Sequence, residues 1–273
     1  MSFRLAWSID LVQRILYPHR LLPPLSMRKT VGEPLWDLHG RQFELTGRHF
    51  EAKLTKDAIL RPESRVLDVG SGCGRIAIPL TEIIGPSGCY FGLEAVKVMV
   101  EWCQREITPR FPHFRFFHCD VRNKAYNPRG RDKPETYQFP FDADQFDLVI
   151  ATSLFTHLPP AATRNYITQC ARVLKAGARL FGTFFLVDNG TRSADGKLDF
   201  SHILDGVALT TNPSVPEEAV AYRSDWLLEA FRRSKLELLP PVRWGGWAGK
   251  EPGYSWQDVL VLQKQEQMNR SGH

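Results

Sequence analysis

The chain has 273 residues, of which 43% are hydrophobic and 24% are charged. This composition is ordinary for a water-soluble globular protein, and the length suits one large α/β domain or one domain with insertions. The formal net charge of +5 is too small to indicate a nucleic-acid partner or an acidic substrate by itself.

The cysteines and the apolar segments indicate a cellular compartment. The five cysteines form no CxxC pair, and an odd number does not suit a closed disulfide framework. We find no secretory signal peptide and therefore expect a reducing cytoplasm. No uninterrupted apolar stretch reaches the ~18 residues that a membrane-spanning helix needs. The sequence thus predicts a soluble, cytoplasmic protein.

The first predicted element is an amphipathic helix over residues 3–17, which Pro18 ends. Its apolar side chains recur at helical spacing: Leu5, Ile9, Val12 and Leu16. In the plainest interpretation this helix packs against its own domain. The alternatives are a lid over an active site and an interfacial anchor that makes peripheral contact with a membrane.

From residue 65 the chain alternates short apolar runs with helical segments, which is the pattern of a parallel sheet with helical crossovers. Five strands are predicted, at residues 65–69, 89–94, 114–119, 146–151 and 178–187. Helices are predicted between them, at residues 75–84, 95–107 and 161–174. Pro79 lies inside the first of these helices and should kink it. Residues 122–142 are rich in proline, glycine and charge, and we expect a surface excursion there.

The C-terminal third contains a longer excursion at residues 188–222, a helix at 224–233 and two closing strands at 236–239 and 258–263. The connection between these strands, which begins at Trp244, is too short and too rich in glycine for a crossover helix. We therefore expect the last two strands to pair antiparallel.

A glycine-rich turn, Gly70-Ser-Gly-Cys-Gly74, joins the first predicted strand to the helix after it. Glycine permits positive φ and a close approach of backbone to ligand, and ligands of open α/β sheets bind beyond the carboxyl ends of the strands. A tight turn without a ligand is the alternative. The dinucleotide motif GxGxxG is not met, because Arg75 stands where its third glycine belongs. Asp68 would repel a pyrophosphate but can hold the ammonium group of a methionine moiety.

Acidic side chains stand at three successive strand ends. The first is Asp68, near the end of the first strand. The second is Glu94, which ends the second strand, where a carboxylate can accept both hydroxyls of a ribose. Asp120 comes after the third strand, where it can accept the exocyclic amine of adenine. Each acid alone is ordinary solvated surface. All three together, after a glycine turn, favour a cofactor with an adenosine and an amino-acid group.

Residues 65–187 resemble the class I S-adenosylmethionine-dependent methyltransferases, in particular the small-molecule group called methyltransferase type 11 or 25. The stretches that carry the resemblance are VLDVGSGCGRIAIPL, YFGLEAVKVMVEWCQ, FFHCDV, FDLVIATSLFTHL and CARVLKAGARLFGTFF. It implies an α/β fold with a Rossmann-like seven-stranded sheet, an antiparallel last strand and helices on both faces. It also implies a methyltransferase domain over residues 61–273, an N-terminal helical extension or lid over 1–60, and a substrate cap at 188–222.

The resemblance also implies S-adenosylmethionine as the cofactor and assigns its binding site. Three groups of residues would hold the methionine moiety, the ribose and the adenine. The methionine moiety would be held by Asp68, Gly70, Gly72 and Gly74. The ribose would be held by Glu94, and the adenine by Asp120 with Val121. Ser71, Ala95 and Thr152 complete the predicted cofactor-binding set.

The residues after the fourth strand constrain the methyl acceptor. A sulfonium is a good methyl donor, so the protein mainly positions the reactants, and a base is needed only for an acceptor such as an alcohol or a phenol. His157 lies just beyond this strand and is the candidate base, with a role in shaping the pocket or capping a helix as the alternative. Asp188 is a second candidate base.

Several motifs of other methyltransferases are absent. The place of the (D/N/S)PP(Y/F) tetrapeptide of base-modifying amino methyltransferases holds Ala151-Thr-Ser-Leu-Phe155, so we expect no nucleic-acid partner. No H-x-E, HExxH or paired-carboxylate cluster is present, so we expect no metal. Four aromatic residues are candidates either for the wall of an acceptor site or for the core: Trp244, Trp247, Tyr254 and Trp256.

The sequence therefore predicts a methyltransferase of a small-molecule acceptor, such as a secondary metabolite or a lipid-like compound, with O-methylation assisted by His157. Two alternatives remain open. One is a methyltransferase of a macromolecule, protein or RNA. The other is a regulatory protein that keeps the fold and the cofactor without catalysis. The oligomeric state is not determined by these patterns.

Overall fold

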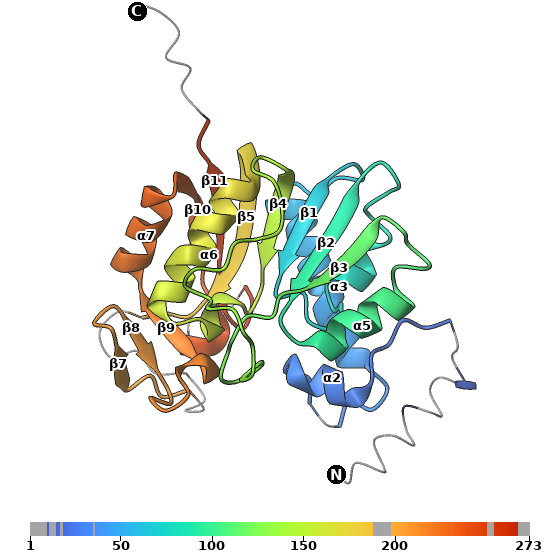
Figure 1. The fold of residues 1–273 in the computed structure, drawn as a ribbon, viewed down its shortest axis with the longest axis horizontal. Coiled ribbons are helices and arrows are strands. Elements are labelled where there is room, and N and C mark those ends of the chain that lie inside the picture. The colour runs from blue at the N-terminus through green and yellow to red at the C-terminus, as the bar shows by residue number, and fades with distance from the viewer. Residues whose placement is uncertain are drawn as a thin grey trace, which may run out of the picture. The chain divides into compact units, whose positions relative to one another are not determined.

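The computed structural model describes residues 10, 15–16, 19–34, 36–187, 198–249 and 254–266 (Figure 1). The predicted helix over residues 3–17 lies almost entirely outside these residues, and Asp188 lies outside them too, so both predictions stay predictions. No helix in the described ranges is both long enough and apolar enough to cross a membrane.

Seven strands form a mixed sheet in the order β10-β11-β5-β4-β1-β2-β3. Their bounds are β1 Arg65–Val69, β2 Cys89–Glu94, β3 Phe114–His118, β4 Phe146–Ala151, β5 Leu174–Phe184, β10 Leu236–Arg243 and β11 Asp258–Lys264. Strand β11 pairs antiparallel with both β5 and β10, whereas β1–β4, β4–β5 and β2–β3 are parallel. The predicted α/β sheet with an antiparallel closing strand is confirmed.

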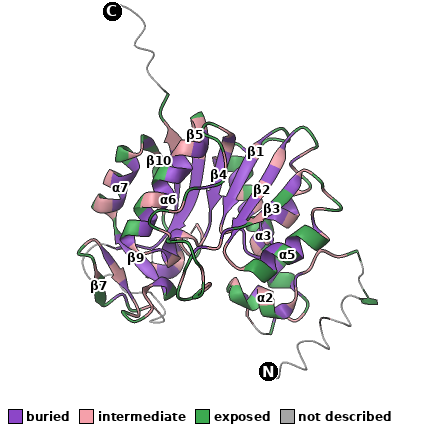
Figure 2. Ribbon diagram, in the orientation of Figure 1, coloured by how far each residue is buried: buried purple, intermediate pink, exposed green. Residues whose placement is uncertain are grey.

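The chain packs as two compact units. The first comprises residues 1–64 and 71–119, and the second comprises residues 65–70 and 120–273. In both, the strands are mostly buried and the helices expose one face (Figure 2).

The first unit contains β2, β3 and four helices: α2 Leu25–Thr30, α3 Arg41–Asp57, α4 Ala77–Leu80 and α5 Lys97–Glu106. The sequence patterns did not predict α3. Its apolar stripe, Phe43, Gly47, Phe50 and Leu54, is buried. Its first three N–H groups are capped by the carboxylate of Asp37, which accepts from Arg41, Gln42 and Phe43.

The helix predicted at 75–84 is shorter than expected, since only Ala77–Leu80 is α-helical. Pro79 has no N–H to donate to the carbonyl of Arg75, four residues earlier. Helix α3 passes close to that carbonyl, because a Cβ on Gly47 would lie 2.4 Å from the Arg75 oxygen. One helical hydrogen bond is therefore missing on the side where α3 approaches, and the helix itself ends at Leu80.

The second unit contains the remaining five strands of the large sheet, with α6 Pro160–Val173 and α7 Ser224–Arg233. The excursion predicted at 188–222 contributes β7, β8 and most of β9 to a second, four-stranded sheet in the order β6-β9-β8-β7. The bounds are β6 Leu186–Val187, β7 His202–Leu204, β8 Ala208–Thr210 and β9 Val220–Arg223, and three 3₁₀ turns are η1 Phe155–His157, η2 Pro216–Glu218 and η3 Gly246–Ala248. The strand predicted at 178–187 is thus divided at Phe185 between the two sheets.

A small core beneath this second sheet decides the role of Trp247. The indole is fully buried against Phe185 and Phe200, and its Nε1 donates to Asp258 Oδ2 at 2.8 Å. Trp247 is therefore a core residue. Trp244 and Trp256 stay partly exposed, at 39% and 48%.

Candidate functional site

The glycine turn of the first unit has the backbone that the sequence predicted. Gly72 and Gly74 have φ of +55° and +81°, a region that other residues adopt only at a cost. A Cβ on Gly72 would lie 2.9 Å from Val31 Cγ1, and one on Gly74 would lie 2.8 Å from Ile107 Cδ1. Both positions thus require glycine for conformation and for space.

Glu94 is the residue that orders this turn. Its buried carboxylate accepts the N–H of Gly72 on Oε2 and the N–H of Val96 on Oε1, both at 2.8 Å. Burial raises the pKa of the Glu94 carboxyl, and these backbone N–H groups oppose that rise. A carboxylate has about four acceptor positions, so the group as a whole can still accept from a ligand hydroxyl. Ala95, also in the predicted cofactor-binding set, follows Glu94 directly, and its carbonyl lies 3.1 Å from His118 Nε2.

Ser71 tests whether this turn fits a polar ligand. Its N–H donates to the carbonyl of Leu93 at 3.3 Å. Its hydroxyl is buried and has no hydrogen-bond partner among the residues that the structure describes. Buried hydroxyls are rarely left without partners in a finished site. The turn therefore fits a ligand that brings its own polar groups.

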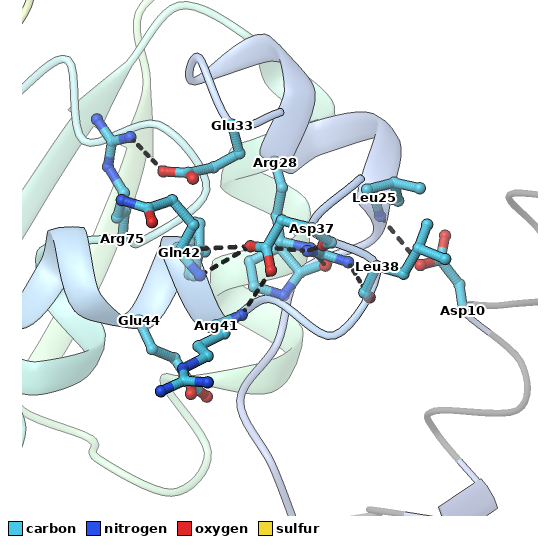
Figure 3. Close-up of polar contacts among 12 residues, drawn as sticks. Asp10, Leu25, Arg28, Glu33, Asp37, Leu38, Arg41, Gln42, Glu44 and Arg75 are labelled. Carbon is cyan, nitrogen blue, oxygen red and sulfur yellow. Dashed lines mark hydrogen bonds and ion pairs between the residues drawn. The ribbon is translucent and has the colours of Figure 1, made fainter. Parts of the chain in front are cut away.

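A segment before the predicted methyltransferase domain packs on the same turn (Figure 3). Arg75 Nη1 donates to the carbonyl of Val31 at 2.8 Å and pairs with Glu33 Oε1 at 2.9 Å. Val31, Leu22 and the α2 side chain Met27 pack against a cluster of Phe43, Cys73 and Met99. Burial raises the pKa of Cys73 to about 12, so this thiol is a packing group.

Arg28 stabilises this segment through buried hydrogen bonds. The guanidinium is fully buried, and it donates to the carbonyl oxygens of Pro23, Asp37 and Leu38. Burial lowers the pKa of Arg28, while the Asp37 carboxylate 3.8 Å away raises it. Figure 3 shows Arg28 and Asp37 side by side at the start of α3. Sequence reasoning missed Arg28 and Asp37, because an arginine near two prolines carries no signal of a buried network.

In the second unit, the other predicted cofactor residues lie at strand ends. Asp68 is 1% exposed in β1, in register with Ile150 of β4. Gly70 has a φ of +82° and packs beside Leu154, while Thr152 directly follows β4 and is buried.

Strand β3 ends at His118, and Asp120 and Val121 follow it after a single intervening residue. The Asp120 carboxylate pairs with Arg131 Nε at 2.6 Å and accepts from Asn127 Nδ2 at 3.3 Å. Val121 is buried, and its carbonyl accepts from the same Asn127 amide at 3.1 Å. The residues assigned to adenine therefore belong to a loop that its own side chains keep ordered.

A residue with a strained backbone follows Thr152. Ser153 has a φ of +53°, which is uncommon for a residue other than glycine and is often found at functional sites. Its N–H donates to Thr183 Oγ1 at 2.7 Å, and its hydroxyl donates to Gln257 Oε1 at 3.1 Å. This bonding fixes the turn after β4, where sequence reasoning had noted only an absent tetrapeptide.

His157 ends the short 3₁₀ turn η1 and is half-buried. Its Nδ1 lies 2.9 Å from the carbonyl oxygen of Glu217, and its Nε2 lies 3.2 Å from the hydroxyl of Tyr126. A carbonyl can only accept, so Nδ1 carries the proton and Nε2 is the accepting atom. Burial lowers the pKa of His157 below its ordinary 6.5, so the ring is neutral at pH 7.

Comparison with known proteins finds similarity to methyltransferases. A family model described as a methyltransferase domain matches residues 66–177. The chain is 33% identical over 92 residues to a protein-L-isoaspartate O-methyltransferase of Methanothrix thermoacetophila, a match that covers 33% of this chain and 43% of the relative. It is 29% identical over 127 residues to the aklanonic acid methyltransferase DauC of Streptomyces sp. strain C5, covering 46% of this chain and 50% of the relative. The chain thus spans half or less of the length of these curated relatives.

Among solved structures, the fold is similar to that of magnesium protoporphyrin IX methyltransferase from Synechocystis PCC 6803 with bound S-adenosylmethionine. The TM-score is 0.51 at 15% identity, over 87% of this chain and 89% of that chain. Residues 66–177 thus match a methyltransferase domain, and the fold is that of the class I S-adenosylmethionine-dependent methyltransferases. The match and the fold support S-adenosylmethionine as the cofactor of this domain.

Proposed function

We propose that this protein transfers a methyl group to the oxygen of a small-molecule acceptor, such as a secondary metabolite or a lipid-like compound, with His157 as the base. One observation carries the proposal. The main-chain oxygen of Glu217 holds the proton on Nδ1, so Nε2 is left as a basic nitrogen on a ring that is neutral at pH 7. A base in this state suits an acceptor hydroxyl that must lose a proton as the oxygen attacks.

The cofactor supplies an electrophilic methyl group on a sulfonium. We propose that the residues assigned to it from the sequence hold it. Asp68, with the turn Gly70–Gly74, would take the methionine moiety, and Glu94 with Ala95 would take the ribose. Asp120 with Val121 would take the adenine, and Thr152 would complete the contacts. Two observations support this set: the buried Ser71 hydroxyl has no hydrogen-bond partner among the described residues, and the Glu94 carboxylate orders the turn through the N–H of Gly72.

Two segments would control access to the reaction. The N-terminal extension, residues 1–60, would act as a lid, and this is supported by the packing of Val31 and Leu22 against the cluster around Cys73. The predicted cap, residues 188–222, would act at the acceptor, and this is supported by η2, which brings the Glu217 carbonyl to His157. Excluding water at this point favours transfer to the acceptor.

A macromolecular acceptor is the second candidate, because one relative is named for methylating a protein. The experiment that decides is methyl transfer from isotope-labelled S-adenosylmethionine to three panels: hydroxylated small molecules, amines, and protein or RNA. Label on hydroxylated small molecules supports the proposal, and label only on protein or RNA refutes it. Cofactor binding without transfer to any panel would indicate the regulatory protein instead.

The base is tested with a matched pair of variants. His157→Asn should lower kcat on a hydroxyl acceptor by about 100-fold, the usual contribution of a positioned base. His113→Asn is the control, because His113 is also half-buried and also contacts one backbone carbonyl, that of Ile84 at 3.0 Å. Equal loss in both variants would refute a role for His157 in proton removal.

A further inference from the structure

We propose that Tyr126 is a second catalytic residue, which takes the proton of the acceptor hydroxyl and passes its own proton to His157. This inference rests on the proposed function, since it needs an acceptor that carries a hydroxyl. It differs from that proposal in assigning the contact with the acceptor to a residue of the 122–142 excursion.

The geometry of the pair carries the inference. The Tyr126 hydroxyl lies 3.2 Å from His157 Nε2, the ring nitrogen that has no proton. The two rings meet edge to face, with centroids 5.0 Å apart and an interplanar angle of 73°. A phenol hydroxyl both donates and accepts. A phenol that donates to an imidazole nitrogen keeps lone pairs on its oxygen, so this type of group can take a proton from an acceptor hydroxyl as it gives up its own.

The loop around Tyr126 is built to hold this contact. Asn123 Nδ2 donates to the carbonyl of His157 at 3.0 Å. The Oδ1 atom of the same side chain accepts the N–H groups of Ala125 at 3.0 Å and Tyr126 at 3.1 Å. One amide therefore ties the backbone of Tyr126 to the backbone of His157. Asn123 is a positioning residue for the pair.

Glu217, whose main-chain oxygen accepts from His157 Nδ1, also has a buried side chain. Glu217 is 9% exposed, and its Oε1 accepts the N–H of Lys124 at 3.3 Å. Its Oε2 has no hydrogen-bond partner among the described residues. The residue whose main-chain oxygen holds Nδ1 is thus itself bonded to the 122–142 excursion, through the N–H of Lys124.

The proposed step balances. The acceptor oxygen bonds to the methyl carbon as the carbon–sulfur bond breaks, and that electron pair stays on sulfur. The acceptor proton moves to the Tyr126 oxygen, and the Tyr126 proton moves to His157 Nε2. Tyr126 ends neutral and His157 ends as an imidazolium, whose Nδ1–H still donates to the Glu217 carbonyl. The positive charge lost at sulfur thus appears on the imidazole and returns to solvent as a proton.

The first test uses a series of phenols of increasing acidity as probe acceptors. Tyr126→Phe keeps the ring and removes the hydroxyl, and should lower kcat about 100-fold on weakly acidic phenols. It should leave nitrophenols that are already ionised at the assay pH at the wild-type rate, because they have no proton to lose. Tyr137→Phe is the control, since Tyr137 lies in the same excursion and its ring packs near Phe139, 6.3 Å between centroids.

The second test needs no acceptor. In histidine-¹⁵N-labelled protein with bound S-adenosylhomocysteine, His157 Nε2 should give the signal of an unprotonated nitrogen that accepts a hydrogen bond. Tyr126→Phe should move that signal to the value of a free imidazole nitrogen and leave Nδ1 in place. Asn123→Ala should give the same shift, and Asn123→Asp, which keeps the accepting oxygen, should give a smaller one.

The outcomes separate the two proposals. If wild type methylates weakly acidic phenols and Tyr126→Phe does so at the same or a higher rate, Tyr126 is not the relay and the proposed function stands. An Nε2 signal that Tyr126→Phe does not move overturns the relay as well. If wild type methylates only amines, the proposed function is wrong, and the relay falls with it. If it methylates only carboxylates, transfer to oxygen stands, but the base role of His157 and the relay are both wrong, because a carboxylate has no proton to lose.

Discussion

Replacing Arg28 with methionine should destabilise the first unit and weaken cofactor binding through it. The side chain is fully buried, and its guanidinium is bonded to the carbonyl oxygens of Pro23, Asp37 and Leu38. Methionine has a similar length and no donors. The substitution therefore leaves three carbonyl oxygens and the Asp37 carboxylate without their cation (Figure 3).

The magnitude follows from these partners. Breaking a buried ion pair by removing one partner costs about 3–5 kcal/mol, and an unsatisfied buried acceptor costs about 1–3 kcal/mol. These costs overlap, because the same guanidinium serves every acceptor, so we expect a loss of about 3–5 kcal/mol. The control is Arg48→Met, which removes a 47% exposed arginine from its pair with Glu82 on the surface. Such pairs contribute about 0–1 kcal/mol.

The assay is urea unfolding, followed by hydrogen exchange with and without S-adenosylhomocysteine. Arg28→Met should expose the N–H groups of Arg41, Gln42 and Phe43, which the Asp37 carboxylate caps in the wild type. Arg28→Lys should be intermediate, since an ammonium cannot reproduce the planar fork. A loss below about 1 kcal/mol in Arg28→Met, or a loss equal to that of Arg48→Met, would contradict the argument.

Four further outcomes are expected. Gly72→Val combined with Glu94→Ala should abolish the calorimetric signal of S-adenosylmethionine binding, and unchanged binding would refute the assigned site. Because burial lowers the pKa of His157 below its ordinary value, its base form persists at neutral pH. The methylation rate should therefore stay level through pH 7 and fall only as the pH drops through the lowered pKa; a fall already above pH 7 would contradict this. EDTA should leave turnover unchanged, whereas a loss that magnesium restores would reveal a metal. Deleting residues 1–18 should leave a folded protein that binds cofactor and turns over poorly, as expected of a lid. The helix pattern suggests a deletion of residues 1–24, but that deletion would also remove Leu22 and so disturb the packing around Cys73.

The sequence alone determined the features that depend on near neighbours. Strands β1, β2 and β4 and helix α7 begin and end at the predicted residues, because apolar runs and helical periodicity are local properties. The glycine turn was predictable for the same reason, since a positive φ at Gly72 and Gly74 excludes most other residues. The position of Glu94 at the end of β2 was predictable as well, because the end of an apolar run is also a local property.

Only the tertiary structure decided which residues meet across the chain. Helix α4 covers only Ala77–Leu80, where α3 approaches it, and β7, β8 and β9 form a second sheet because they pair with one another and with Leu186–Val187. No local pattern in the sequence predicts either result.

The same holds for the polar networks. His157 meets Tyr126 and Glu217, which lie 31 and 60 residues away, and no spacing rule links such positions. Arg28 looks like a surface cation in the sequence, and becomes a buried donor only because three carbonyl groups converge on it. A hydrogen bond is satisfied by whichever partner the fold brings within about 3 Å, so the sequence specifies the donor and the fold selects the acceptor.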